Sequence, residues 1–244
     1  LNFKIELRTE QLIADAVPML DRVSGDRVRH ELVLIFHEAE PERALCRLHE
    51  LGALEAIVPG LRCDRWLKTR FRQLRRAGDD PAWGLAQAGM RFGYLGLLLY
   101  RLLPAKLRAV KKRLRLGRDD VKRLNEVQQI RERRPALAEA ERASQIYRLL
   151  SSFSTQALLV VWAAEAQVRP QIYRYQAELR DIETALDGHY LIERYGLDPG
   201  PIFGRLLNRV RDARLDGQVT TRADEEALLE QLLDQMEHTG GDSV

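Results

Sequence analysis

The sequence predicts an all-α protein, an elongated array of roughly ten helices without a β-sheet. Three observations favour this fold class. Ala, Leu, Arg, Glu and Gln, which have high helix propensity, are abundant. No alternation of apolar and polar residues typical of a strand persists beyond a few positions. Pro and Gly recur where helices are expected to begin and end.

In the first half of the chain, boundary residues predict most of the helices. Ser24 can cap a helix that has an acidic residue in its first turn, as the helix dipole favours. Pro41 suits the first turn of the next helix, and Gly52 its end. Pro104 ends a long apolar segment or begins another helix. The helical segments expected here are 9–17, a segment after Ser24, 41–51, 64–76 and 83–103.

The second half is predicted from the same kinds of signal. Gly117 precedes two acidic residues that suit a first helical turn, and Pro135 ends that helix. Pro170 and Pro201 each suit the start of a helix. The polar residues from Thr239 onward predict a frayed end. The helical segments expected here are 117–133, 144–150, 154–168, 170–185, 201–214 and 223–237.

Composition excludes several classes of protein. With 244 residues, 45% hydrophobic and 31% charged, the chain has enough apolar residues for a core. No apolar run approaches the ~20 residues that cross a bilayer, so no membrane partner is expected. Cys46 and Cys63 are too few for a disulfide framework or a zinc site, which favours a reduced, cytoplasmic setting. The chain begins at Leu1 without a signal-peptide pattern, and we expect it to be part of a longer polypeptide.

Charge is unevenly distributed along the chain, although the net charge is only +3. Between residues 101 and 134 there are thirteen basic and four acidic residues, whereas acidic residues dominate from 223 to 242. Such a distribution favours contact with a polyanion through one part of the molecule. Basic residues that bind phosphates release counterions, so the affinity should fall steeply with salt. The candidate contacts are Arg108, Lys111, Lys112, Arg115 and Arg118; the alternative is an ordinary solvated helix face.

A second candidate site lies at the start of the 201–214 helix. Gly200 is expected to take a positive φ at a sharp turn, and Pro201 can begin the helix without losing a hydrogen bond. The free N–H groups of such a helix start attract phosphate. Arg205 and Arg209 lie close behind it and are candidate phosphate contacts together with Gly200.

Catalytic and metal sites are not expected. His30 and His37 lack a third ligand, and no pair of His residues has the i, i+4 spacing of a zinc protease. Most aromatic residues have the spacing of core positions, and Trp66, between Arg65 and Lys68, is the first candidate for base stacking.

Two blocks of sequence resemble one known family. Residues 197–204 (LDPGPIFG) and 212–222 (DARLDGQVTTR), with Glu225 and Glu226, resemble the C-terminal tail of bacterial tRNA nucleotidyltransferases and their poly(A) polymerase relatives. Upstream, His189 and Tyr190 stand where the family usually has a GxDL element. Residues 23–32, 44–54 and 57–59 resemble the neck that follows the catalytic head of the same polymerases.

The resemblance implies a division into parts. Residues 1–62 would be a neck-like RNA-binding domain, 63–180 a body-like domain, 181–238 a tail-like domain, and 239–244 a disordered end. These helical parts would hold the acceptor stem and the TΨC side of tRNA during 3′-end nucleotide addition. A Gly-Ser turn with metal-binding carboxylates is absent from the chain, so we expect it to be inactive alone. Mg²⁺ and CTP or ATP are expected only for the missing N-terminal head of the same polypeptide.

Two alternatives remain open. A stand-alone helical protein-interaction or regulatory module would use the basic face to meet an acidic protein. An enzyme with an unrecognised site would contain a metal or cofactor. Within the leading hypothesis, addition of CCA, of A alone or of a poly(A) tail is decided by the head and stays open.

Overall fold

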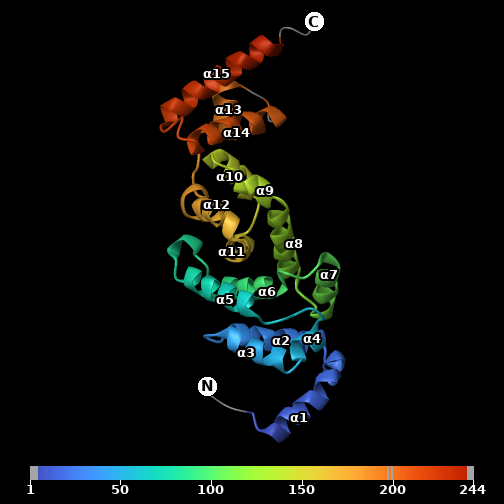
Figure 1. Ribbon diagram of the computed structural model, residues 1–244. Coiled ribbons are helices and arrows are strands. Elements are labelled where there is room, and N and C mark those ends of the chain that lie inside the picture. Colours follow the sequence, from blue (N-terminus) through green and yellow to red (C-terminus); the bar gives the residue numbers. More distant parts are fainter. Residues whose placement is uncertain (1–4, 197, 199, 241–244) are drawn as a thin grey trace. The chain divides into compact units, whose positions relative to one another are not determined.

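A computed structural model describes residues 5–196, 198 and 200–240 of the chain (Figure 1). In these residues it contains fifteen α-helices and no strand, so the all-α prediction is confirmed and the expected number of helices is too low. The chain forms two compact units. Unit 1 comprises Leu1–Arg134 and Phe153–Arg169, and unit 2 comprises Pro135–Ser152 and Pro170–Val244. The division into neck-like, body-like and tail-like parts stays a prediction.

Unit 1 begins with four helices whose boundaries follow from the sequence. They are α1 (Leu7–Ala16), α2 (Gly25–Phe36), α3 (Pro41–Glu50) and α4 (Ala53–Ile57). Ser24 caps α2, as expected, because its Oγ accepts a hydrogen bond from the amide of Arg27 at 3.4 Å. Gly52 separates α3 from α4 in a left-handed conformation, with φ of 77°. The first turn of α2 packs so closely on α7 (Pro104–Arg113) that a Cβ at Gly25 would lie 1.8 Å from the Arg113 carbonyl oxygen.

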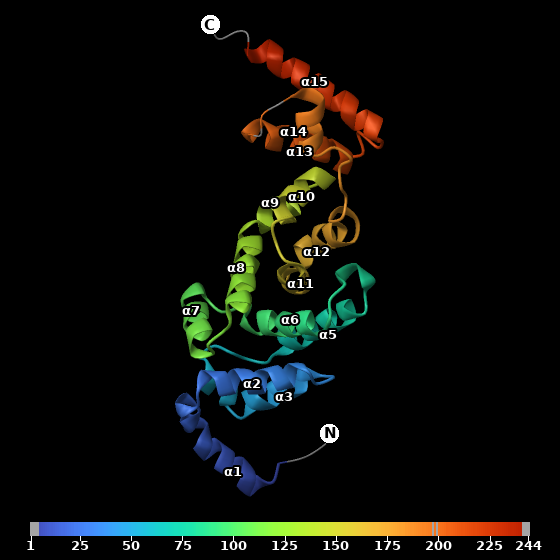
Figure 2. The ribbon, with the colours of Figure 1, turned by 180° about the vertical axis from the view of Figure 1, so that it is seen from behind.

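The core of unit 1 forms around α11 (Thr155–Ala164), which is almost entirely buried. It packs on α5 (Arg65–Gly78), α6 (Gln87–Leu99) and α8 (Arg118–Glu132). α5 and α6 lie side by side in both views (Figure 2). Gly96 allows α6 to approach α11, because a Cβ there would lie 2.6 Å from a methyl group of Val160. Each fully buried aliphatic side chain of this core contributes roughly 1.5–3 kcal/mol.

The apolar segment expected as one helix over 83–103 is divided. Trp83 lies in the 3-10 turn Pro81–Trp83, which ends at Gly84 with φ of 53°. α6 then begins at Gln87 and ends at Leu99, and α7 begins at Pro104. Gly84 explains the break, because a left-handed residue terminates a helical turn.

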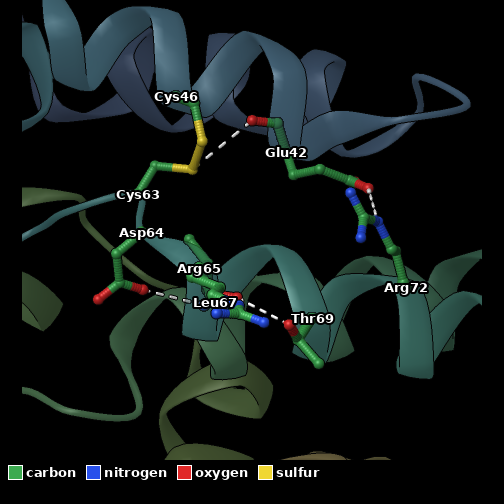
Figure 3. The surroundings of a disulfide bond; sticks show 8 residues. All are labelled: Glu42, Cys46, Cys63, Asp64, Arg65, Leu67, Thr69 and Arg72. Atoms are coloured by element: carbon green, nitrogen blue, oxygen red, sulfur yellow. Dashed lines mark hydrogen bonds and ion pairs between the residues drawn. A yellow bond between two sulfur atoms is a disulfide. The ribbon is translucent and has the colours of Figure 1, made fainter.

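Cys46 and Cys63 form a disulfide, which corrects the expectation of reduced thiols (Figure 3). Cys46 lies on α3 and Cys63 immediately precedes Asp64, whose carboxylate caps α5 at the amide of Leu67. Their Cα atoms are 4.8 Å apart, within the range that a disulfide spans. Counting cysteines could not reveal this proximity, because the two residues are brought together by the packing of α3 against α5.

Beside the disulfide, the buried carboxylate of Glu42 joins α3 to α5. It accepts hydrogen bonds from both Nη atoms of Arg75, at 2.9 and 3.0 Å, and lies 3.9 Å from Arg72 Nε (Figure 3). Burial acts to raise the pKa of Glu42, but the hydrogen bonds from Arg75, a backbone hydrogen bond and the charges of Arg75 and Arg72 together outweigh it, and the pKa is lowered. The carboxylate therefore stays charged and holds the two helices together.

Unit 2 has its core between α13 (Gly188–Tyr195), α14 (Pro201–Leu215) and α15 (Arg222–Gly240). Its buried side chains are Leu186, Leu191, Phe203, Leu206, Val210 and Leu229. α14 buries one apolar face, which includes Leu206, Val210 and Ala213. α10 (Ala143–Leu150) also packs on α14, where Asp216 accepts hydrogen bonds from the amide and hydroxyl of Ser144 at 2.9 and 2.7 Å.

The helix expected over 170–185 is α12 (Arg169–Arg174), which continues into a π-helical turn over Tyr175–Leu179. Two further short helices, α4 and α9 (Arg134–Ala138), were not expected and have only five residues each. Segments this short contain too few turns to show a period. Of the end expected to be disordered, 239 and 240 belong to α15, and 241–244 lie outside the described residues.

Candidate nucleic-acid interface

The basic residues predicted on α7 lie along one side of that helix. Leu107 and Val110 are buried and fix the opposite side against the rest of unit 1. Arg108, Lys111 and Lys112 therefore share a face at i, i+3 and i+4. Arg108 and Lys112 are exposed and have no ion pair within the described residues, so they are available to an anion.

The other members of this set have partners inside unit 1 or stand apart. Lys111 Nζ lies 2.6 Å from the side-chain oxygen of Asn125, and burial together with Arg108 lowers its pKa. Arg115, which has φ of 47°, forms an ion pair with Asp26 at 2.8 Å. Arg118 is exposed in the first turn of α8, beyond the end of α7.

Gly200 occupies the N-cap of α14 and is exposed. Its φ is −172°, an extended conformation, so the expectation of a positive φ is wrong. The extended conformation suffices because an N-cap residue ordinarily lies in the β region. Among the described residues no side chain caps this helix start, and Pro201 occupies its first position, as predicted.

Arg205 and Arg209 line an open groove in unit 2 where α10 meets α14. The groove has a volume of about 550 Å³. Arg205, Asn208, Arg209 and Asp212 follow one side of α14 at helical spacing, and the opposite wall comes from α10 and the residue after it. The full lining is Tyr147, Arg148, Ser151, Arg205, Asn208, Arg209, Arg211 and Asp212. We call these eight residues the arginine groove.

The groove carries a net positive charge, because four arginines face one carboxylate. Arg148 forms an ion pair with Asp212 at 3.2 Å, and the other three arginines form none within the part of the chain described. Burial raises the pKa of Asp212, although Arg148 acts in the opposite direction. Arg211 lies 5.8 Å from the centre of the Tyr147 ring, within the range of a cation–π contact.

Six residues of the arginine groove were not predicted. Tyr147, Arg148 and Ser151 were missed because α10 reaches α14 across about 60 residues of sequence, and no local pattern connects them. Asn208, Arg211 and Asp212 lie on α14 beside the two predicted arginines. Gly200, in contrast, is not part of the groove lining, so the structure brings together Arg205 and Arg209 and leaves Gly200 at the helix start.

Arg214 follows the same helix but faces the core of unit 2. Its guanidinium donates to the carbonyl of Thr220 at 2.8 Å and to the buried carboxylate of Glu225 at 3.1 Å. Glu225 also accepts hydrogen bonds from the amides of Ala185 and Leu186, at 2.8 and 3.2 Å. This arrangement fixes α14 to α15 and to the segment before α13.

The Trp66 ring is engaged within unit 1. It is half-buried, with the Arg101 guanidinium 4.5 Å from its centre and the Tyr100 ring at 6.0 Å. In the described residues, no three His, Cys, Asp or Glu side chains are grouped as metal ligands. None of the helices described is both long and apolar enough to span a bilayer.

Residues 2–64 match a family model described as the probable RNA- and SrmB-binding site of polymerase A. The A-adding tRNA nucleotidyltransferase of Geobacter sulfurreducens is 29% identical, over 96% of this chain and 28% of that protein. The CCA-adding enzyme of Limosilactobacillus reuteri is 25% identical, over 91% of this chain and 54% of that protein. The chain thus spans between about a quarter and about half of these relatives.

A solved structure shows the same helical fold. It is the Thermotoga maritima CCA-adding enzyme complexed with tRNA, with a TM-score of 0.74 and 23% identity, covering 97% of this chain and 58% of that one. A second, titled as the complex of a CCA-adding enzyme with CTP, has a TM-score of 0.72 and 25% identity over 97% of this chain. The resemblance to tRNA nucleotidyltransferases that the sequence indicated is therefore confirmed.

Proposed function

We propose that this relative of the A-adding and CCA-adding tRNA nucleotidyltransferases is the tRNA-binding helical portion of such an enzyme. It holds the acceptor stem and the TΨC side of tRNA while a catalytic head of the same polypeptide extends the 3′ end. The head supplies the chemistry with Mg²⁺ and CTP or ATP. A relative solved in complex with tRNA, and the match to a model of an RNA-binding site, support this proposal.

The observation that carries the proposal is the arginine groove. Double-stranded RNA presents a regular phosphate backbone and few accessible base edges, so it is bound largely through shape and phosphate contacts. A groove with four arginines and one carboxylate, of which three arginines have no ion pair in the described chain, matches such a backbone. Arginine suits this contact because its planar group of N–H donors can hold a phosphate through two hydrogen bonds.

The exposed basic residues of α7, in unit 1, can also contact backbone phosphates. Arg108 and Lys112 offer charge without a concave surface, which suits contacts that position a backbone rather than enclose it. We also place this function in the cytoplasm. The Cys46–Cys63 disulfide is unusual for that compartment, where thiols are normally kept reduced.

The test is binding of tRNA to the chain at two salt concentrations. The unchanged chain is expected to bind at low salt and to lose affinity steeply as salt rises. In the variant Arg205→Ala/Arg209→Ala we expect the affinity to fall roughly 100-fold or more, since each of the two arginines loses a charge-assisted hydrogen bond that contributes about 1.5 kcal/mol or more. The slope of log affinity against log salt should fall by about 1 for each arginine removed.

The matched control is Arg194→Ala, an exposed arginine on α13 that is not part of the groove. It removes one charge from unit 2 and should change the affinity little. An absence of tRNA binding at low salt would rule out the proposed function. Equal losses of binding free energy per arginine removed, in the groove variant and the control, would show that net charge, not the groove, governs binding.

A further inference from the structure

A second pair of arginines, in unit 1, converges on a single side-chain oxygen. Arg70 Nη1 donates to Gln73 Oε1 at 3.1 Å, and Arg169 Nη2 donates to the same oxygen at 3.0 Å. Arg70 and Gln73 lie one turn apart on α5, whereas Arg169 follows α11 and lies 96 residues further along the chain than Gln73. The fold therefore brings together two like charges that the sequence keeps far apart.

No carboxylate neutralises this pair within the described residues. Arg169 Nε also donates to the carbonyl oxygen of Trp162 at 3.1 Å, so both of its protein acceptors are uncharged. Gln73 is the sole hydrogen-bond acceptor of Arg70 in the described structure, and the Arg70 Nε is buried without a partner. Each guanidinium has five N–H donors, so most of those of Arg70 have no acceptor in this part of the protein.

The surroundings remove part of each guanidinium from water without supplying an opposite charge among the described residues. Both arginines are half-buried. Burial, and then the charge of Arg70, lower the pKa of Arg169, which reports the repulsion between the two groups. A buried charge that lacks an opposite charge costs free energy, and a buried N–H donor without an acceptor adds to that cost.

Two tryptophans orient the pair. The guanidinium carbon of Arg70 lies 5.8 Å from the centre of the Trp66 ring, and that of Arg169 lies 5.4 Å from the Trp162 ring. A guanidinium that lies on an aromatic face keeps its N–H donors in its own plane, free for a ligand at its edge. Gln73 holds the two groups at a fixed separation, since it accepts from both.

We propose that Arg70 and Arg169 form a clamp that binds one phosphate group of the RNA backbone, at a site separate from the arginine groove. The inference rests on the proposed function for the identity of the ligand, an RNA phosphodiester. A phosphate offers several acceptor oxygens and the negative charge that the pair lacks. It can accept several hydrogen bonds from both guanidiniums, whereas the single neutral oxygen of Gln73 accepts one from each.

The first experiment uses inorganic phosphate as the probe and the side-chain ¹⁵N–¹H resonances of arginine in the unchanged chain. The Nε–H resonances of Arg70 and Arg169 should shift on addition of phosphate, and chloride at the same ionic strength should leave them in place. In Arg70→Gln, the phosphate-dependent shift of Arg169 should be lost. Resonances that respond equally to chloride and phosphate would overturn the clamp.

The second experiment measures tRNA affinity against salt in the double variant Arg70→Gln/Arg169→Gln. We expect about a tenfold loss of affinity and a salt slope smaller by about 1. Arg76→Gln is the matched control, because Arg76 lies exposed on the same helix, has no ion pair in the described chain and is not part of the pair. It should change the affinity less than twofold.

The variant Arg70→Lys separates a loss of binding from a loss of folding. It keeps the charge and the helix propensity but cannot donate two parallel hydrogen bonds, so it should lower affinity while the melting temperature stays unchanged. If tRNA binds and the double variant behaves like Arg76→Gln, the clamp is wrong and the proposed function stands. If the unchanged chain does not bind tRNA, the proposed function is wrong, and the phosphate titration alone then decides whether the anion site exists.

Discussion

The basic face of α7 and the arginine groove between α10 and α14 contain similar numbers of cations but arrange them differently. Lys111 on α7 donates a hydrogen bond to Asn125, and Arg115, just beyond the end of α7, pairs with Asp26, so the remaining charges project singly into solvent. In the groove, Arg205, Arg209 and Arg211 join Arg148 around one concave surface. The more basic segment of sequence thus forms the more dispersed surface, and the less basic segment forms the more concentrated one.

This difference has a physical cause. The basic face of α7 belongs to a single helix. Side chains project outward from a helix axis, so its basic groups point away from one another. The groove is assembled from two helices whose facing sides bring side chains toward one point. A phosphate is held more strongly where several arginine side chains point toward one place than where many basic residues are close in sequence. Each additional side chain can then donate a hydrogen bond to the same phosphate.

Of the changes that distinguish the arginine groove from α7, Glu225→Ala should have the largest effect, a loss of stability confined to unit 2. The buried carboxylate of Glu225 supports α14 through Arg214 and the amides of Ala185 and Leu186. Its removal leaves a guanidinium and two amides unpaired, which should cost about 3–5 kcal/mol of the free energy of unfolding of unit 2. Chemical denaturation followed by hydrogen exchange should show this loss in α13, α14 and α15, with α7 and the rest of unit 1 unchanged.

The neighbouring Glu226→Ala is the matched control. Glu226 pairs with Arg222 on the surface of α15, so its removal should change the stability little. Loss of protection in α7 together with α14 in the Glu225→Ala variant would show that the two units unfold as one.

A smaller effect should distinguish the two basic surfaces directly. We expect Arg108→Ala/Lys112→Ala to weaken tRNA binding by about 2- to 30-fold, because the two single exposed charges each contribute roughly 0.2–1 kcal/mol. The loss should remain well below that of Arg205→Ala/Arg209→Ala in the same assay. A greater loss from the α7 variant would reverse the comparison and place the main phosphate contacts in unit 1.

The smallest expected effect is a pH-dependent change in stability at the start of α15, which packs on α14. The carboxylate of Asp224 accepts hydrogen bonds from the amides of Thr220 and Thr221, at 2.9 and 2.8 Å, which lower its pKa to about 2. Because the pKa is lower in the folded chain, this stabilisation is present above the pKa of the unfolded chain, about 3.9, and is lost as the pH falls through about 2.

An NMR titration of the Thr220 and Thr221 amides checks this prediction. Their shifts should follow a midpoint near 2, and the step should vanish in Asp224→Asn, which keeps an acceptor but does not titrate. A midpoint near 4 would mean that the carboxylate is not held by these amides in solution.

Much of the fold could be predicted because helix boundaries are local. Ser24, Pro41, Pro104 and Pro201 each begin or cap a helix where the sequence indicated. α13 and the short α4 and α9 were missed, because a helix of two turns or fewer shows little periodicity.

The candidate sites were less predictable, because they depend on contacts between distant segments. Arg205 and Arg209 could be found from their place behind a helix start, but Arg148 reaches them from α10. Arg70 and Arg169 meet only through the packing of α5 against the end of α11. Pairs of this kind leave no local signal in a single sequence.

The Cys46–Cys63 disulfide has a consequence for how the chain responds to its chemical environment. It closes a loop across a separation of 17 residues. By the chain-entropy model this lowers the conformational entropy of the denatured state and stabilises the folded state by about 3 kcal/mol. A thiol reductant would restore that freedom and loosen the junction of α3 with α5, whose helix carries Arg70 and Gln73. The redox conditions around the protein are thereby coupled to the stability of α5, the helix that carries Arg70 of the guanidinium pair.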